Sequence, residues 1–150
     1  MNYSKETIVH LVKLIKGKDE SRIWLQRNNF HELILLHYSL KGYDDSLKKI
    51  SDKKHFDVIA FAHAVRGDKT AFKWLIDNKK AEWAATASTI NKDKKAEKWL
   101  LNYKLYHYIE LANAIKENTD IVQDDNIFST IARSFGMLVR RIFRRIRKKY

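Results

Sequence analysis

The sequence contains no cysteine and no proline. Without cysteine the chain can form neither disulfide bridges nor thiolate metal sites, which is typical of proteins in a reducing compartment. We therefore expect a cytoplasmic protein. Without proline, helices must be ended by glycine, by polar capping residues and by connecting turns.

Long hydrophobic runs are also missing. No uncharged stretch approaches the ~18–20 residues that are needed to span a bilayer, so we expect no transmembrane segment. The first six residues, Met1 to Glu6, contain no apolar run of signal-peptide length before the first charges. The sequence therefore predicts neither a signal peptide nor a membrane-spanning helix.

Glycine is scarce, but its spacing is regular. Three of the four glycines, Gly17, Gly42 and Gly67, stand 25 residues apart. A second series keeps the same interval in register: Leu25, Ile50, Leu75 and Leu100. A period of this length indicates a tandem repeat, in which each unit buries its apolar face against its neighbours. The units comprise residues 8–32, 33–57, 58–82 and 83–107, with a partial fifth at 108–125.

Each unit has the pattern of two short antiparallel helices. In the third unit, Ile59, Ala62 and Val65 lie three residues apart, a spacing that marks one face of a first helix. Gly67 can take the left-handed conformation that ends this helix, and Asp68 can cap the next one. The fourth unit has Asp93 in that capping position, whereas Asp19 and Asp44 lie one position later in their units. No run alternates with the period of a strand, so we predict one all-α domain, an α-α superhelix.

The second unit departs from this pattern. Ala71, Trp74 and Leu75 form the apolar stripe of the second helix in the third unit, and Trp24 and Trp99 stand at the Trp74 position in two other units. In the second unit that position is Lys49, and the alanine position is Ser46. We therefore expect its second helix to be shorter or more exposed.

Charge is distributed unevenly along the chain. The formal net charge is +12, and hydrophobic residues make up 45% of the chain, which is too apolar for a disordered protein. Residues 1–125 contain 22 basic and all 18 acidic residues, a net charge of +4, whereas residues 126–150 contain eight basic residues and no acid. The last 25 residues therefore carry two thirds of the excess positive charge.

This basic segment predicts a longer C-terminal helix over residues 126–148, which Asp124, Asp125 or Asn126 can cap. Apolar residues such as Phe135, Leu138 and Ile142 fall in one sector at 100° per residue. The basic residues fall mainly on the opposite side, with Arg145 at the border and Lys149 on the apolar face. The candidate anion-binding residues are Arg133, Arg140, Arg141, Arg144, Arg145, Arg147, Lys148 and Lys149.

Three interpretations of this helix remain open. Its apolar face can cap the open end of the solenoid, with its arginines simply solvated. The same capping helix can also bind nucleic-acid phosphates, helped by Lys92, Lys94, Lys95 and Lys98. Alternatively, the helix detaches and lies on an anionic membrane or in the groove of a calmodulin-like partner.

No motif of an enzyme is present. The six histidines lack the His-Glu-x-x-His spacing of a zinc site, and His37, which takes the position of Ala62 and Ala87, is expected to be a packed side chain. The glycines are single, so no phosphate-binding loop forms.

The pairs Asp44-Asp45 and Asp124-Asp125 stand at predicted helix starts, where capping explains them. Tyr108 aligns with apolar positions and is expected to pack between layers. We predict no catalytic residue, no metal site and no cofactor.

The 25-residue helical unit resembles the leucine-rich-variant type of repeat, within the broad class that includes HEAT repeats. The series Gly67, Asp68, Ala71, Trp74 and Leu75 resembles that of uncharacterised bacterial helical-repeat proteins, and the resemblance covers residues 8–117. It implies a scaffold that binds something along a groove or an edge. The first functional hypothesis is therefore a non-enzymatic scaffold for protein–protein interaction, with an unknown protein partner. The alternative is nucleic-acid binding through the C-terminal cations.

Overall fold

We analysed a computed structural model of the chain, which describes residues 3–43 and 45–121. This part of the chain is all-helical and contains no strand, so the predicted fold class is confirmed. The helices are α1 (Lys5–Ile15), α2 (Asp19–Arg27), α3 (His31–Leu40), α4 (Asp45–Ser51), α5 (Phe56–Val65), α6 (Lys69–Asp77), α7 (Ala81–Ile90), α8 (Lys94–Asn102) and α9 (Tyr106–Asn118). The predicted C-terminal helix over residues 126–148 lies outside the described residues.

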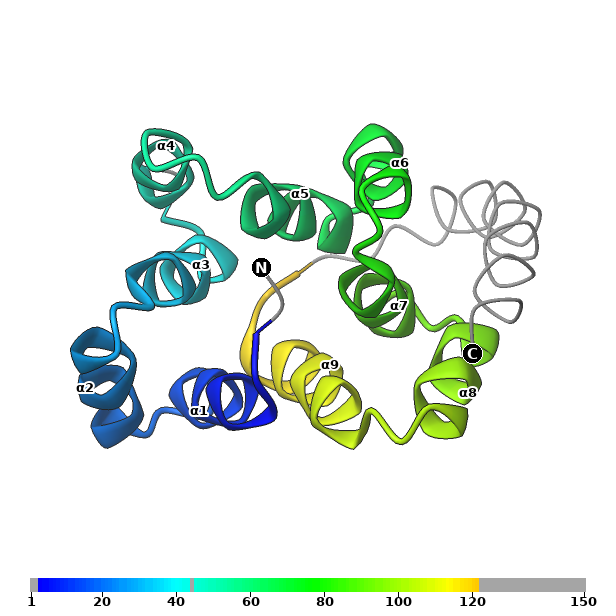
Figure 1. Cartoon of the computed structure of the whole chain (residues 1–150), viewed down its shortest axis with the longest axis horizontal. Coiled ribbons are helices and arrows are strands. Elements are labelled where there is room, and N and C mark those ends of the chain that lie inside the picture. Colours follow the sequence, from blue (N-terminus) through cyan, green and yellow to red (C-terminus); the bar gives the residue numbers. More distant parts are fainter. Residues whose placement is uncertain (1–2, 44, 122–150) are drawn as a thin grey trace.

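The helices form two concentric layers (Figure 1). The odd-numbered helices α1, α3, α5, α7 and α9 make an inner layer in which each packs against the next. The outer helices α2, α4, α6 and α8 each pack against the two inner helices on either side. Each 25-residue unit therefore contributes one inner and one outer helix, as the spacing predicts.

The inner layer closes into a ring, a point that the sequence did not predict. Helix α1 packs against α9, so the first and last repeats are neighbours (Figure 1). The expected superhelix therefore has no open end in the inner layer of the described residues. This removes the reason for expecting a terminal helix to cap the array, because the faces it would cover already contact each other.

The glycine positions end the inner helices as predicted. Gly17 has a φ of +90° and Gly42 has a φ of +97°, a conformation that costs glycine little. The Gly17 N–H donates to the Leu14 carbonyl at 2.9 Å, and the Lys18 N–H donates to the Lys13 carbonyl at 3.0 Å. This pair of bonds is the Schellman motif, which satisfies carbonyls at the end of a helix.

A second left-handed position in each unit ends the outer helices. None of the four residues at this position is glycine, but they keep the 25-residue period and have φ between 56° and 62°: Asn29, Lys54, Lys79 and Lys104. After α6, the Lys80 N–H donates to the Leu75 carbonyl at 2.8 Å, and the Asn78 side chain donates to the Trp74 carbonyl at 2.8 Å. The sequence analysis missed these turns because lysine is no signal for a left-handed conformation.

Aspartates cap two of the outer helices, as predicted. The Asp68 carboxylate accepts hydrogen bonds from the N–H groups of Thr70 and Ala71 at 2.9 and 3.0 Å. Asp93 accepts from Lys95 at 2.9 Å and from Ala96 at 3.4 Å. Helix α2 lacks such a bond because its N-cap residue is Lys18, and Asp19 falls inside its first turn.

The core consists of layers that repeat around the ring. In each unit the inner helix contributes one side chain to each layer, so equivalent residues are buried together. One layer contains Ile8, Leu33, Val58, Trp83 and Tyr108; the next contains Leu11, Leu36, Phe61, Thr86 and Leu111; a third contains Ile15, Leu40, Val65, Ile90 and Ile115. Small residues such as Ala62, Ala87 and Ala112 are also fully buried and let the inner helices approach closely.

Both described ends of the chain contribute to the middle of the ring. Tyr3 precedes α1 and makes edge-on ring contacts with Phe30 and Trp83, with centroids 5.9 and 5.7 Å apart. Ile121, which follows α9, is partly buried against the core. The described part of the fifth unit therefore turns inward after α9 (Figure 1).

Candidate functional site

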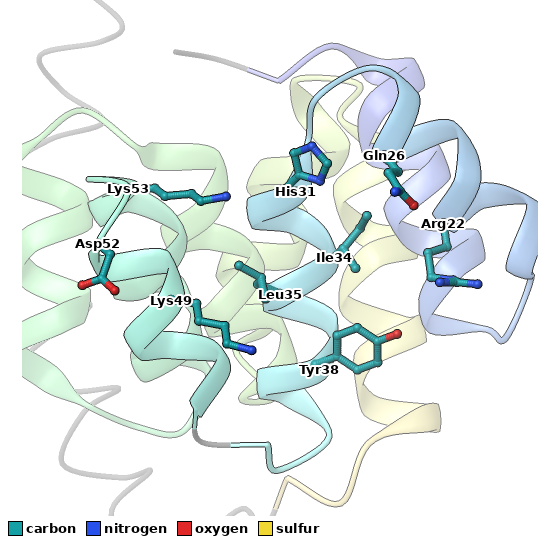
Figure 2. A pocket seen from close by; sticks show the side chains of 9 residues that line it. All are labelled: Arg22, Gln26, His31, Ile34, Leu35, Tyr38, Lys49, Asp52 and Lys53. Atoms are coloured by element: carbon teal, nitrogen blue, oxygen red, sulfur yellow. The ribbon is translucent and has the colours of Figure 1, made fainter.

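A groove opens on the outer layer between α2 and α4, above α3. Its volume is about 490 Å³, which is in the usual range for ligand sites of about 300–1,000 Å³. Figure 2 shows that side chains of α3 form its floor, whereas side chains of α2 and of α4 with the turn after it form its walls. The lining residues are Arg22, Gln26, His31, Ile34, Leu35, Tyr38, Lys49, Asp52 and Lys53.

The groove exists because the second unit has no tryptophan. In the first unit, Trp24 stacks on His10 with ring centroids 4.0 Å apart and an interplanar angle of 8°. Twenty-five residues later, the equivalent pair is Lys49 and Leu35, and Lys49 is exposed. A lysine stem covers less surface than an indole and keeps its ammonium group in water. The floor is therefore left open at this position.

The burial of the floor residues differs between units in the same way. Leu35 is only partly buried, whereas the equivalent alanines of the next two units, Ala60 and Ala85, are 6% and 2% exposed. Those units have Trp74 and Trp99 in the position of Lys49, and both tryptophans pack against the core. The groove above α3 therefore exposes apolar surface that the equivalent places of the third and fourth units bury.

The walls of the groove are basic. Arg22, Lys49 and Lys53 line it, against a single carboxylate from Asp52. None of the three cations forms an ion pair within the described part of the chain. In the other units the position of Arg22 is Leu47, Phe72 or Glu97, so this combination of cations is specific to one groove.

Exposed aromatic side chains extend the groove at one end. Tyr38 lines it and is 37% exposed, and its ring meets that of Tyr43 edge-on with centroids 6.0 Å apart. Tyr43 is 63% exposed. Aromatic rings with a polar tip are common at protein interfaces, because they offer apolar area together with a hydrogen-bonding group.

A second polar cluster lies where the inner helices begin. The Tyr3 hydroxyl donates to the Glu32 carboxylate at 2.9 Å, and Lys80 lies 3.7 Å from the Asp57 carboxylate. Burial, and secondarily the neighbouring carboxylate of Glu32, raise the pKa of Tyr3 above its ordinary value of 10.0. A tyrosine that resists ionisation is suited to donating one fixed hydrogen bond. The acidic groups also lie near helix N-termini, where the helix dipole stabilises them. This cluster joins the N-terminal residues to the ring.

The predicted candidate residues stand apart from this groove. The C-terminal cations, Arg133 to Lys149, lie outside the described residues. Lys94, Lys95 and Lys98 are exposed on α8, and Lys92 is exposed in the turn before it. Helix α8 packs against α7 and α9 and lies across the ring from α4 (Figure 1). Lys94 also pairs with Glu97 at 3.1 Å. The structure therefore brings none of these four lysines to the groove.

Two further expectations concern packed side chains, and both are confirmed. His37 is 5% exposed, and its Nδ1 has no hydrogen-bond partner among the described residues. Tyr108 is 5% exposed and meets Trp83 edge-on at 5.9 Å.

The sequence analysis did not identify the groove, although its signal was present. Lys49 and Ser46 were interpreted as a weak second helix in the second unit, and α4 is indeed short, with seven residues against nine in α2, α6 and α8. Lys49 also opens a groove, because of the side chains of α2 and α3 that stand opposite it. Only the folded structure shows which side chains these are.

Residues 3–43 and 45–121 contain no group of three or more His, Asp or Glu side chains placed to hold a metal ion. Within the same residues, no helix has the length and apolar character needed to cross a membrane.

Comparisons of the chain with models of protein families, with curated proteins and with solved structures found no match.

Proposed function

We propose that this protein is a non-enzymatic binding scaffold that holds a protein partner in the groove between α2 and α4. The observation that carries the proposal is the partly exposed apolar floor at Leu35, where Lys49 replaces the tryptophan of the other units. Exposed apolar surface rimmed by polar residues is typical of interaction sites. The lack of cysteine supports a cytoplasmic location for this activity.

Site-specific photocrosslinking tests this function. A photoreactive phenylalanine analogue placed at Tyr38 should crosslink to a protein from a lysate of the source cells, because Tyr38 lines the groove. The matched control carries the analogue at Lys13, an exposed residue of α1 that does not line the groove. Protein adducts at both positions in equal yield, or at neither, would contradict a groove-centred scaffold.

Nucleic-acid binding through the C-terminal cations is the second candidate. The observation that favours it is the set of eight basic residues and no acid in residues 126–150. If about five of these charges meet duplex phosphates, log affinity should fall against log salt with a slope near −4.5. Replacing Arg140, Arg141, Arg144 and Arg145 with glutamine should reduce that slope. Anionic vesicles that bind the full chain while DNA and RNA do not would instead indicate peripheral membrane association.

A further inference from the structure

The repeat itself indicates what the groove lacks. Three units place a tryptophan of the outer helix over the inner helix: Trp24, Trp74 and Trp99. Trp24 shows the geometry directly, since its indole stacks on His10 at 4.0 Å. In the second unit the surface that would receive the indole is Leu35, and the residue that would supply it is Lys49. The position over Leu35 is therefore one that an aromatic side chain fills in three other units.

The charges on the walls of the groove indicate which residues flank that aromatic side chain in the occupant. In the equivalent places between α4 and α6 and between α6 and α8, the residues that correspond to Arg22 and Lys53 are Leu47 with Asn78, and Phe72 with Tyr103. Only the groove between α2 and α4 combines two such cations with Lys49, and none of the three is paired within the described residues. Charge complementarity favours carboxylates on the occupant, placed to either side of the aromatic group.

These features favour a peptide over a nucleic acid. The floor under Lys49, at Ile34 and Leu35, is aliphatic and the exposed rings of Tyr38 and Tyr43 lie only at one end, whereas bases bind to single-stranded sites by stacking on aromatic faces. Asp52, which stands among the cations, can accept a hydrogen bond from a peptide N–H.

We propose that the occupant of the groove is an acidic peptide segment of a partner protein that inserts one tryptophan over Leu35. Its indole lies over Leu35 in the way that the Trp24 indole lies over His10. Its flanking Asp and Glu residues pair with Arg22, Lys49 and Lys53. This inference rests on the proposed function and specifies the chemistry of the partner.

The test uses the full chain and three fluorescent 12-residue peptides. The first carries Asp and Glu around a central tryptophan, the second has alanine in place of that tryptophan, and the third has lysine in place of the acids. Fluorescence anisotropy should show the first peptide binding at least tenfold more tightly than either of the others. Equal binding of the first and second peptides, or no binding of the first, would overturn the proposal.

The decisive variant fills the position from within the chain. Lys49→Trp restores the residue that the other units carry, so it should weaken binding of the first peptide at least tenfold while preserving the helical circular dichroism and the melting temperature. The matched control is Lys48→Trp, which adds the same side chain one residue away on α4, at an exposed residue that does not line the groove. That control should bind like the wild type.

The possible outcomes separate the partner's chemistry from the function itself. If Lys49→Trp binds the peptide as the wild type does, the tryptophan position is not the site. If a single-stranded DNA 12-mer binds more tightly than the peptide and is excluded by Lys49→Trp, the occupant is a nucleic acid. If Tyr38 crosslinks to a protein partner while the acidic peptide fails to bind, only the partner's chemistry is overturned, and the scaffold function stands.

Discussion

His37 shows how a single residue can depart from the repeat at a cost in stability. The equivalent residues of later units are Ala62, Ala87 and Ala112, which let neighbouring inner helices pack closely. Burial, with a smaller contribution from the positive charge of Lys41, lowers the pKa of His37 from 6.5 to about 4. The folded protein therefore holds His37 neutral in a pH range where the unfolded chain would protonate it.

This difference predicts a loss of stability in mild acid. The unfolded state binds the additional proton, so the contribution of His37 is fully present above about pH 6.5 and is lost as the pH falls toward 4. The complete loss corresponds to roughly 3 kcal/mol, at about 1.36 kcal/mol for each unit of pKa difference. Urea unfolding between pH 7 and pH 5 should show part of this decline, before carboxyl groups titrate.

The control for this prediction is His37→Ala, which places the residue of the later units at this position. Because burial also lowers the pKa of His10 and His107, some pH dependence should remain in the variant. The slope of unfolding free energy against pH should nevertheless be smaller than in the wild type. Identical slopes for the two proteins would show that His37 has the same pKa in the folded and unfolded states, which would contradict the prediction.

At the scale of single helices, the capping residues distinguish otherwise similar elements. Helices α6 and α8 begin after Asp68 and Asp93, whose carboxylates accept N–H groups of the first turn. Helix α2 begins after Lys18, which offers no acceptor. Helices α6 and α8 are therefore capped more firmly than α2.

This asymmetry predicts opposite effects for two substitutions. Asp68→Ala should destabilise the protein by about 1 kcal/mol, because two N–H groups of α6 lose their acceptor. Lys18→Asp should stabilise it by up to about 1 kcal/mol, since it gives α2 the cap that α6 has. Chemical unfolding of both variants measures these changes. A destabilised Lys18→Asp would show that Lys18 makes a contact more valuable than a cap.

Closure of the ring is a property of the whole molecule. An open array has two ends that can fray, because each repeat contacts only its neighbours. Here α1 and α9 are neighbours although their sequences are about 100 residues apart, so every inner helix packs between two others. A substitution that destabilises α9 should therefore also destabilise α1, at the start of the chain.

Leu111→Ala in α9 tests this coupling. Leu111 is fully buried, so its truncation should cost about 2–5 kcal/mol. Amide hydrogen exchange should accelerate in α1 about as much as in α7, because both helices pack against α9. In an open array α7 would respond while α1 would not, and this second result would contradict closure.

The period of the sequence was sufficient to determine the helix pairs, because each helix is specified by nearby residues. Gly17, Gly42 and Gly67 end the inner helices, Asp68 and Asp93 begin outer ones, and apolar residues three apart give each inner helix its buried face. The second series of turns escaped notice, since Lys54, Lys79 and Lys104 take a left-handed conformation that lysine seldom adopts.

Only the tertiary structure decided how the pairs are arranged and where a partner can bind. The rotation from one unit to the next accumulates over the repeat, and its sum brings α9 back to α1; no local pattern encodes that sum. The groove likewise depends on side chains of three helices. Lys49 was visible as an exception in the sequence, but its meaning depends on Leu35 beneath it and Arg22 across from it.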